Sequence, residues 1–205
     1  MIRRASIVIL PLAVVAACVS HSSDGDGSQP PHDARSREVL TTDGGRAESQ
    51  ADPGSSDATA EPWTDPSSGF TWQVAPSGGP MDWYAAKIHC SDLDLEGGGW
   101  RLPSISELRT LIRGCPATEA GGSCSVQDGG CLALNCGDSS CDGCSDTGGP
   151  SGGCYWPDEM QGECTRYWSS SREEEDPFWI WYGNFASGMI SRVAVYNSAY
   201  ARCVR

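Results

Sequence analysis

Cysteine is the residue type whose spacing most directly indicates chemistry in this chain of 205 residues. There are eleven cysteines, and eight of them lie between residues 115 and 164. Cys141 and Cys144 form a Cys-x-x-Cys pair. Thiolates at this spacing can hold zinc or exchange disulfides, whereas oxidised cysteines cross-link a loop-rich domain. A redox pair normally opens a helix, but this pair lies among glycines, which favours structural disulfides.

The first residues indicate the compartment. Arg3 and Arg4 precede an apolar run over 7–17, which is typical of an export signal and too short to span a bilayer. The run ends in Val-Ala-Ala-Cys18, which resembles the bacterial lipobox, in which cleavage leaves a lipid-modified cysteine at the N-terminus. We therefore expect a lipoprotein signal peptide at 1–17 and membrane attachment through a lipid on Cys18. The alternatives are an ordinary signal peptide or an uncleaved anchor.

Cysteine parity agrees with export. Without Cys18, ten cysteines remain, an even number that can pair completely in an oxidising compartment. Residue 19 is valine. In the lipoproteins that this N-terminus resembles, inner-membrane members carry aspartate at that position, so valine favours the outer membrane. The expected location is the cell envelope. The cysteines expected in disulfides are Cys90, Cys115, Cys124, Cys131, Cys136, Cys141, Cys144, Cys154, Cys164 and Cys203.

The chain divides into a polar segment and one domain. Residues 18–60 are mostly Ser, Asp, Gly, Pro, Ala and Arg, and such a composition cannot bury enough apolar surface to fold. We expect a disordered tether there. All eight tryptophans lie from Trp63 onward, so the folded domain is predicted at 61–205.

Charge excludes some partners. Lys and Arg number 14 and Asp and Glu 27, for a formal charge of −13, which argues against nucleic acid as a partner.

Three acidic clusters could supply oxygen ligands to a weak calcium site, although solvated surface charge is the default interpretation. They are Asp92, Asp94 and Glu96; Asp138, Asp142 and Asp146; and residues 173–176. No cofactor is expected.

The domain is predicted to be α+β. Asp82 is a plausible N-cap for a helix over 83–93, and Ser104 and Glu107 form a capping box for a second helix that ends at Gly114. Short aromatic and β-branched strands are predicted at 167–168, 178–185, 189–196 and 200–204, with turn residues between them. Two short helices followed by strands indicate an antiparallel sheet.

Residues 115–164 form a cysteine-rich insert between these halves. The insert is rich in Gly, Ser and Asp and has almost no apolar content, so we expect cross-links alone to fix its shape.

Several strings in the domain resemble the DUF1566 family, also called the Lcl C-terminal domain. They are Phe-Thr-Trp-Gln at 70–73, Gly-Trp-Arg-Leu-Pro-Ser at 99–104, Tyr-Trp-Ser-Ser at 167–170, Trp-Tyr-Gly-Asn-Phe at 181–185 and Ala-Arg-Cys-Val-Arg at 201–205. The resemblance implies a C-type-lectin-like α+β fold with a disulfide between Cys90 and Cys203. The other eight cysteines allow 105 pairings, among which the sequence does not choose.

The same family includes an adhesin that binds sulfated glycosaminoglycans. That ligand is not carried over, because an acidic domain repels a polyanion. The resemblance does not extend to the insert.

Five aromatic residues could stack on sugar rings. They are Trp179, Trp181, Tyr182, Tyr196 and Tyr200. Alternate residues of a strand face opposite sides, and both the set Trp179/Trp181 and the set Phe178/Ile180/Tyr182 are bulky. At least one set must therefore belong to the core, and the other could be the binding surface. The alternative is that both sets belong to the core.

The sequence therefore favours a non-enzymatic binding module with a lectin-like face for a glycan or a protein. An alternative is an envelope scaffold that contacts an envelope or extracellular protein through the insert, which would show as an apolar patch there. An enzyme is a distant third, and it would show as a cleft with perturbed acids.

Overall fold

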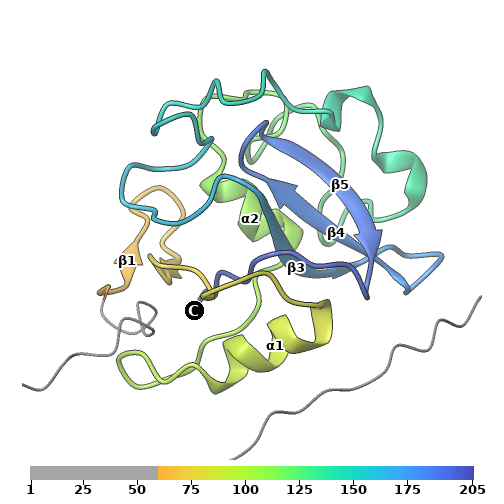
Figure 1. The fold of residues 1–205 in the computed structure, drawn as a ribbon. Helices are drawn as coiled ribbons and strands as arrows, with labels where there is room; N and C mark the ends of the chain where they lie inside the picture. The colour runs from red at the N-terminus through yellow and green to blue at the C-terminus, as the bar shows by residue number, and fades with distance from the viewer. Residues whose placement is uncertain (1–59) are drawn as a thin grey trace, which may run out of the picture. The chain divides into compact units, whose positions relative to one another are not determined.

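The computed structural model describes residues 60–205, so the predicted signal peptide, Cys18 and all but the last residue of the predicted tether lie outside the described residues. The domain is α+β, as predicted (Figure 1). A two-stranded ribbon of β1 (Trp63–Thr64) and β2 (Thr71–Trp72) comes first, followed by α1 (Trp83–Asp92) and α2 (Ile105–Leu111). Two short 3₁₀ turns in the insert, η1 (Leu134–Cys136) and η2 (Ser139–Cys141), precede β3 (Arg166–Arg172), β4 (Trp179–Asn184) and β5 (Met189–Ala194).

Local sequence signals set the two helices. The Asp82 carboxylate accepts a hydrogen bond from the backbone N–H of Ala85, which caps α1. The Ser104 hydroxyl and the Glu107 carboxylate form the predicted capping box of α2. The second helix ends earlier than predicted, because Ile112 already has extended backbone dihedral angles. The apolar sides of both helices pack against the sheet.

The three strands β3, β4 and β5 form one antiparallel sheet in chain order. Between Trp168 and Arg172 the register of β3 against β4 shifts, so β3 bulges there before Arg172 pairs with Ile180. A final strand at 200–204 was predicted, but this segment makes only isolated bridges. Tyr200 bridges Tyr167, and Val204 bridges both Trp72 and Arg101, so no single neighbour pairs with it continuously.

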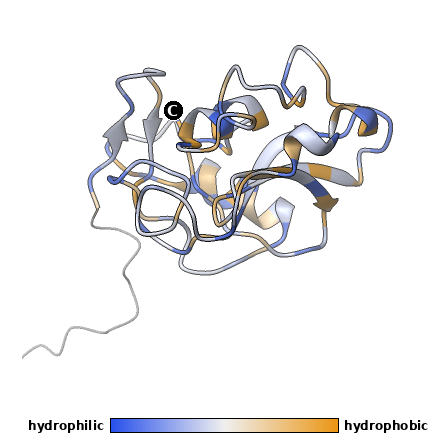
Figure 2. Ribbon diagram, turned by 90° about the horizontal axis from the view of Figure 1, so that it is seen from above, coloured by the Kyte–Doolittle hydropathy of each residue, from blue (hydrophilic) through white to orange (hydrophobic). Residues whose placement is uncertain are grey.

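The insert is not held by cross-links alone, which corrects the expectation from composition. Val126, Tyr155, Trp156 and Met160 are buried and belong to the same core cluster as α2. Figure 2 likewise shows hydrophobic positions on coil segments as well as on the helices and strands. The error arose because the average composition of the insert is polar, whereas a few large side chains at its ends supply the burial.

All ten cysteines of the domain are paired, as predicted, and Cys90–Cys203 is the pair that the family resemblance implied. Three insert disulfides are nested inside one another, and the fourth follows them. They are Cys115–Cys144, Cys124–Cys141, Cys131–Cys136 and Cys154–Cys164. The cysteines of the Cys-x-x-Cys string thus belong to two different disulfides, so they are neither a redox dithiol nor zinc ligands.

Two buried arginines bind the insert through its backbone carbonyls. Arg109 of α2 donates to the carbonyls of Thr118 at 2.9 Å and Val126 at 2.7 Å. Arg202 donates to the carbonyls of Gln73 at 2.9 Å and Gln161, and it also bonds Val74. Burial lowers the pKa of both guanidinium groups, yet an arginine this basic keeps its charge.

Replacing Arg202 tests this interpretation. We expect Arg202→Lys to lower the free energy of unfolding by about 3 kcal/mol or more, because an ammonium cannot reach carbonyls on two separate segments and leaves buried acceptors unpaired. Urea-induced unfolding measures the loss. Arg166→Lys, at an exposed position on β3, is the control and should change stability by less than about 0.5 kcal/mol. Equal effects of the two variants would contradict the prediction.

Candidate functional site

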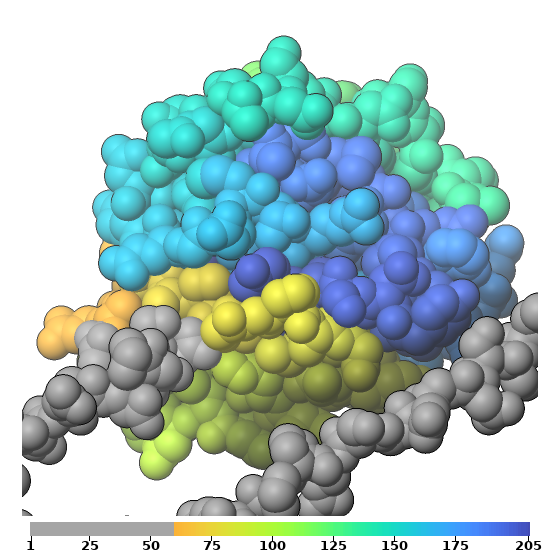
Figure 3. Space-filling view, viewed as in Figure 1, coloured from red at the N-terminus to blue at the C-terminus, as the bar shows by residue number. Residues whose placement is uncertain are grey.

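A groove of about 660 Å³ lies where the insert meets the end of β3, and we call it the insert groove. In Figure 3 the teal insert and the blue β3–β4 connection meet at the right-hand side of the molecule. The volume of the groove is within the usual range for small-ligand sites. The groove is lined by Asp128, Gly129, Gly130 and Leu132 of the insert and by Ser170, Ser171, Arg172, Glu173, Glu174 and Pro177.

A tight turn presents Asp128 on one wall. The backbone N–H of Gln127 donates to the carbonyl of Cys131 at 3.0 Å, and that of Gly130 donates to the carbonyl of Gln127 at 3.2 Å. Gly129 has a φ of +71°, a conformation that glycine adopts without strain. The Cys131–Cys136 disulfide adjoins this turn. The sequence therefore places the carboxylate on a cross-linked turn.

The Asp128 carboxylate joins the insert to α2 and β3. One oxygen accepts the Ser171 hydroxyl at 2.5 Å, and the other accepts the backbone N–H of Ser106 at 3.0 Å. The Ser106 hydroxyl in turn accepts the backbone N–H of Asp128 at 2.7 Å. Burial acts to raise the pKa of Asp128, but the bonds from Ser171 and Ser106 outweigh it and lower the pKa. The group therefore stays ionised at neutral pH.

The opposite wall comes from the irregular end of β3. Glu173 is buried and forms an ion pair with Arg192 at 2.5 Å, so its charge is already compensated. The backbone N–H of Glu174 donates to the carbonyl of Leu132 at 3.2 Å, which fixes the distance between the walls. The Glu174 side chain is exposed. Arg172 donates to the carbonyl of Pro177 at 3.2 Å.

This arrangement suits hydrogen bonding better than proton transfer. A general acid at neutral pH needs a carboxyl whose pKa is raised, whereas the pKa of Asp128 is lowered. An ionised carboxylate is a strong acceptor for hydroxyl donors. The groove therefore offers acceptors at Asp128 and Glu174 together with the charged donor Arg172.

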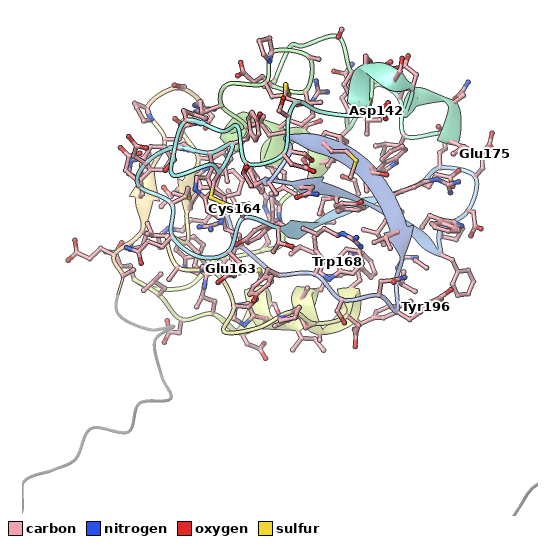
Figure 4. The ribbon with its side chains drawn as sticks, turned by 45° about the horizontal axis from the view of Figure 1, so that its top comes forward. Asp142, Glu163, Cys164, Trp168, Glu175 and Tyr196 are labelled. Atoms are coloured by element: carbon pink, nitrogen blue, oxygen red, sulfur yellow. A yellow bond between two sulfur atoms is a disulfide. The ribbon has the colours of Figure 1, made fainter. Side chains whose placement is uncertain are left out.

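The five aromatic residues predicted to stack on sugars do not share one surface. Trp181 and Tyr182 are buried, which is a correction to their predicted role. The Trp181 indole N–H donates to the carbonyl of Leu132 at 2.9 Å, so the insert covers it. Tyr196 is 77% exposed, and Figure 4 shows it at the edge of the domain.

The remaining two aromatics occupy separate places. Trp179 is half-buried beside Arg192, whose guanidinium carbon lies 4.5 Å from the ring centroid. Tyr200 lines a second cleft of about 310 Å³, together with residues 75–78 and 161–163. Neither residue lines the insert groove.

The acidic clusters do not assemble a metal site within residues 60–205, where no three His, Cys, Asp or Glu side chains are grouped to hold an ion. Several members have local structural roles instead. Glu96 pairs with Arg205, Asp138 accepts the backbone N–H of Ser140, and Asp176 accepts that of Phe178. These aspartates cap turns.

The groove residues Asp128, Ser171 and Arg172 were not singled out from the sequence. The available signals were the Asp-Gly-Gly turn at 128–130 and the serine run at 169–171, in which alternation places Ser169 and Ser171 on the buried side.

The network at Asp128 makes stability depend on pH. Because its folded pKa is lowered from 3.8, the stabilisation is present above that value and is lost as pH falls through the folded pKa. Asp128→Asn should cost about 1 kcal/mol at pH 6, and the difference from wild type should shrink at pH 3. Thermal unfolding at both pH values measures it, with the exposed insert residue Asp142→Asn as the control (Figure 4). A difference that grows on acidification would refute this reading.

No helix among residues 60–205 has both the length and the hydrophobicity that crossing a bilayer requires.

Comparison with known proteins agrees with the architecture. The chain matches no curated protein. Residues 62–205 match the model of the Lcl C-terminal domain, a stretch that includes both helices, the sheet, the insert and the groove. The chain therefore belongs to the Lcl C-terminal domain family.

Proposed function

We propose that this chain is a non-enzymatic, lipid-anchored protein of the cell envelope whose lectin-like domain binds a neutral glycan in the insert groove and serves adhesion. The insert groove itself carries the proposal. It combines ionised acceptors, a charged donor and a rigid frame, and sugars are recognised by such fixed polar groups because their hydroxyls donate and accept in defined directions. The groove lies within the residues that match the Lcl C-terminal domain.

Charge favours a neutral glycan over an anionic one. The described domain carries nineteen acidic and nine basic side chains, and Asp128 and Glu174 both face the groove. A sulfated or phosphorylated sugar would meet like charge at these two positions. Sugar hydroxyls would instead donate to the same carboxylates.

The envelope location rests on the N-terminal sequence. The lipobox-like string ending in Cys18 and the valine at position 19 support a lipid anchor in the outer membrane. Five disulfides in the domain agree with passage through an oxidising compartment.

A scaffold that contacts a protein partner through the insert is the less favoured function. Such a surface would be expected to present an apolar patch. Leu134 is the one large hydrophobic side chain of the insert that is exposed. The proposal of glycan binding therefore comes first.

A glycan array tests the groove directly. The full chain, oxidised and purified in detergent, is applied with calcium and again with EDTA. We expect binding to neutral glycans that survives EDTA, because hydrogen bonds to Asp128 and Glu174 need no metal. Glu174→Gln should weaken binding about tenfold, which corresponds to roughly 1.4 kcal/mol.

Glu159 provides a matched control for this experiment. It has the same chemistry and is exposed, but it does not line the groove. Glu159→Gln should bind like wild type. A blank array would overturn the glycan proposal in favour of a protein partner, and equal losses in both variants would place the ligand elsewhere.

Lipidation is tested by Cys18→Ala. If Cys18 carries the anchor, the wild-type protein should begin at Cys18 and carry the added mass of the acyl chains, whereas the variant should lack that mass and keep residues 1–17, because the modified cysteine is gone. Intact mass measures both consequences. A wild-type protein without the added mass would rule out the anchor.

A further inference from the structure

Four large hydrophobic side chains are exposed around one buried residue, Trp83, and we call them the Trp83 patch. They are Tyr84, Ile88, Phe178 and Tyr196, and their exposed fractions are 54%, 60%, 63% and 77%. Among residues 60–205 only one other large hydrophobic residue, Leu134, is comparably exposed. Exposed hydrophobic residues that lie singly are ordinary, whereas a contiguous group marks a contact surface.

Backbone hydrogen bonds bring together the three segments that carry the patch. The N–H of Trp83 donates to the carbonyl of Val195 at 3.1 Å, which places Tyr196 beside the start of α1. The N–H of Val195 donates to the carbonyl of Phe178 at 2.9 Å. On α1, the Tyr84 ring lies 5.2 Å from that of Trp83, and Ile88 follows one turn later on the same face. Three separate segments thus contribute to one surface.

Two cations lie within the patch. The Lys87 ammonium is 4.7 Å and the Arg172 guanidinium carbon 4.4 Å from the Trp83 ring centroid. Stacking on the indole holds them in place. Neither forms an ion pair among the described residues, unlike Arg101, Arg113, Arg192 and Arg205.

Acidic side chains stand at the rim of the same surface. Asp82 directly precedes Trp83 and is exposed, and Glu175 lies on the connection that leads to Phe178. Figure 4 shows Glu175 and Tyr196 along the same edge of the domain. The patch therefore has an apolar centre and both signs of charge around it, so it is complementary to a copy of itself rotated by half a turn.

We propose that the Trp83 patch is the interface through which two copies of this chain form a twofold dimer. In a twofold interface the same surface of each copy meets that of the other, so the unpaired Lys87 of one copy faces the rim acids of the other. Aromatic residues and arginine are also enriched in protein interfaces. An anionic membrane is disfavoured, because the domain carries an excess of acidic groups.

The test uses the chain from Val19 onward, which lacks both the apolar run at 7–17 and Cys18 and therefore needs no detergent. Sedimentation equilibrium between micromolar and millimolar concentration should give a mass that rises to twice that of one chain. Ile88→Glu and Tyr196→Glu should each remain monomeric, because each places two buried carboxylates in a symmetric interface. Both positions are exposed, so circular dichroism should be unchanged.

Leu134→Glu is the matched control, since Leu134 is similarly exposed but lies on the insert. It should dimerise like the parent chain. A parent chain that is monomeric at millimolar concentration overturns the proposal. Dimers that persist in both patch variants, or that are lost in Leu134→Glu, overturn the assignment to the Trp83 patch.

Discussion

The buried guanidinium of Arg202 connects parts of the chain that no regular strand or helix connects. It is fully buried and has no carboxylate partner among the described residues. Instead it bonds carbonyls at Gln73, Val74 and Gln161, and its guanidinium carbon lies 5.0 and 5.1 Å from the ring centroids of Trp156 and Tyr167. Burying an unpaired charge is costly unless hydrogen bonds replace its water, and these carbonyls do so. The first segment, the end of the insert and the last segment are thereby held together.

Arg109 does the same at the start of the insert, so the two arginines bind both ends of a segment that has little regular structure of its own. Between those ends the nested disulfides fix the course of the chain. The insert groove depends on this arrangement, because the Asp128 turn lies on the insert and its opposite wall belongs to β3. A loose insert would leave Asp128, Ser106 and Ser171 unable to meet.

Local features of the fold could be predicted from sequence, because their causes lie within a few residues. The N-cap at Asp82, the capping box of Ser104 and Glu107 and the strands around 178–196 are such features. Long-range features could not. From the sequence, Trp181 is a strand aromatic whose side chain could be exposed. In the structure the insert, which is distant in sequence, covers it. Likewise Ser171 gains a role only because Asp128 is brought within 2.5 Å.

The candidate site was the least predictable part for the same reason. Cysteine parity predicted complete pairing, and family resemblance implied Cys90–Cys203, but spacing alone could not choose the nested order of the others. The groove has two walls that are distant in sequence, with Asp128 and Ser171 separated by 43 residues, and the charges on each wall are set by partners on other elements. A sequence pattern shows which side chains are available, whereas the disulfide pairing of the insert determines which of them come into contact.

Stability does not explain the four exposed hydrophobic residues of the Trp83 patch. The core already holds Trp72, Trp83, Trp168 and Trp181, and the disulfides and buried arginines fix the remaining segments. A tyrosine that is 77% exposed and an isoleucine that is 60% exposed contribute little buried area to the monomer. On an acidic, otherwise polar domain they carry a solubility cost that folding does not require. Arg172 both stacks on Trp83 and lines the insert groove, so a dimer formed through the patch would set two grooves close to the interface. In the proposed dimer, two linked weak sites would bind a repeating glycan more tightly than either site alone, which would give the exposed residues a role in binding that their burial within one chain does not supply.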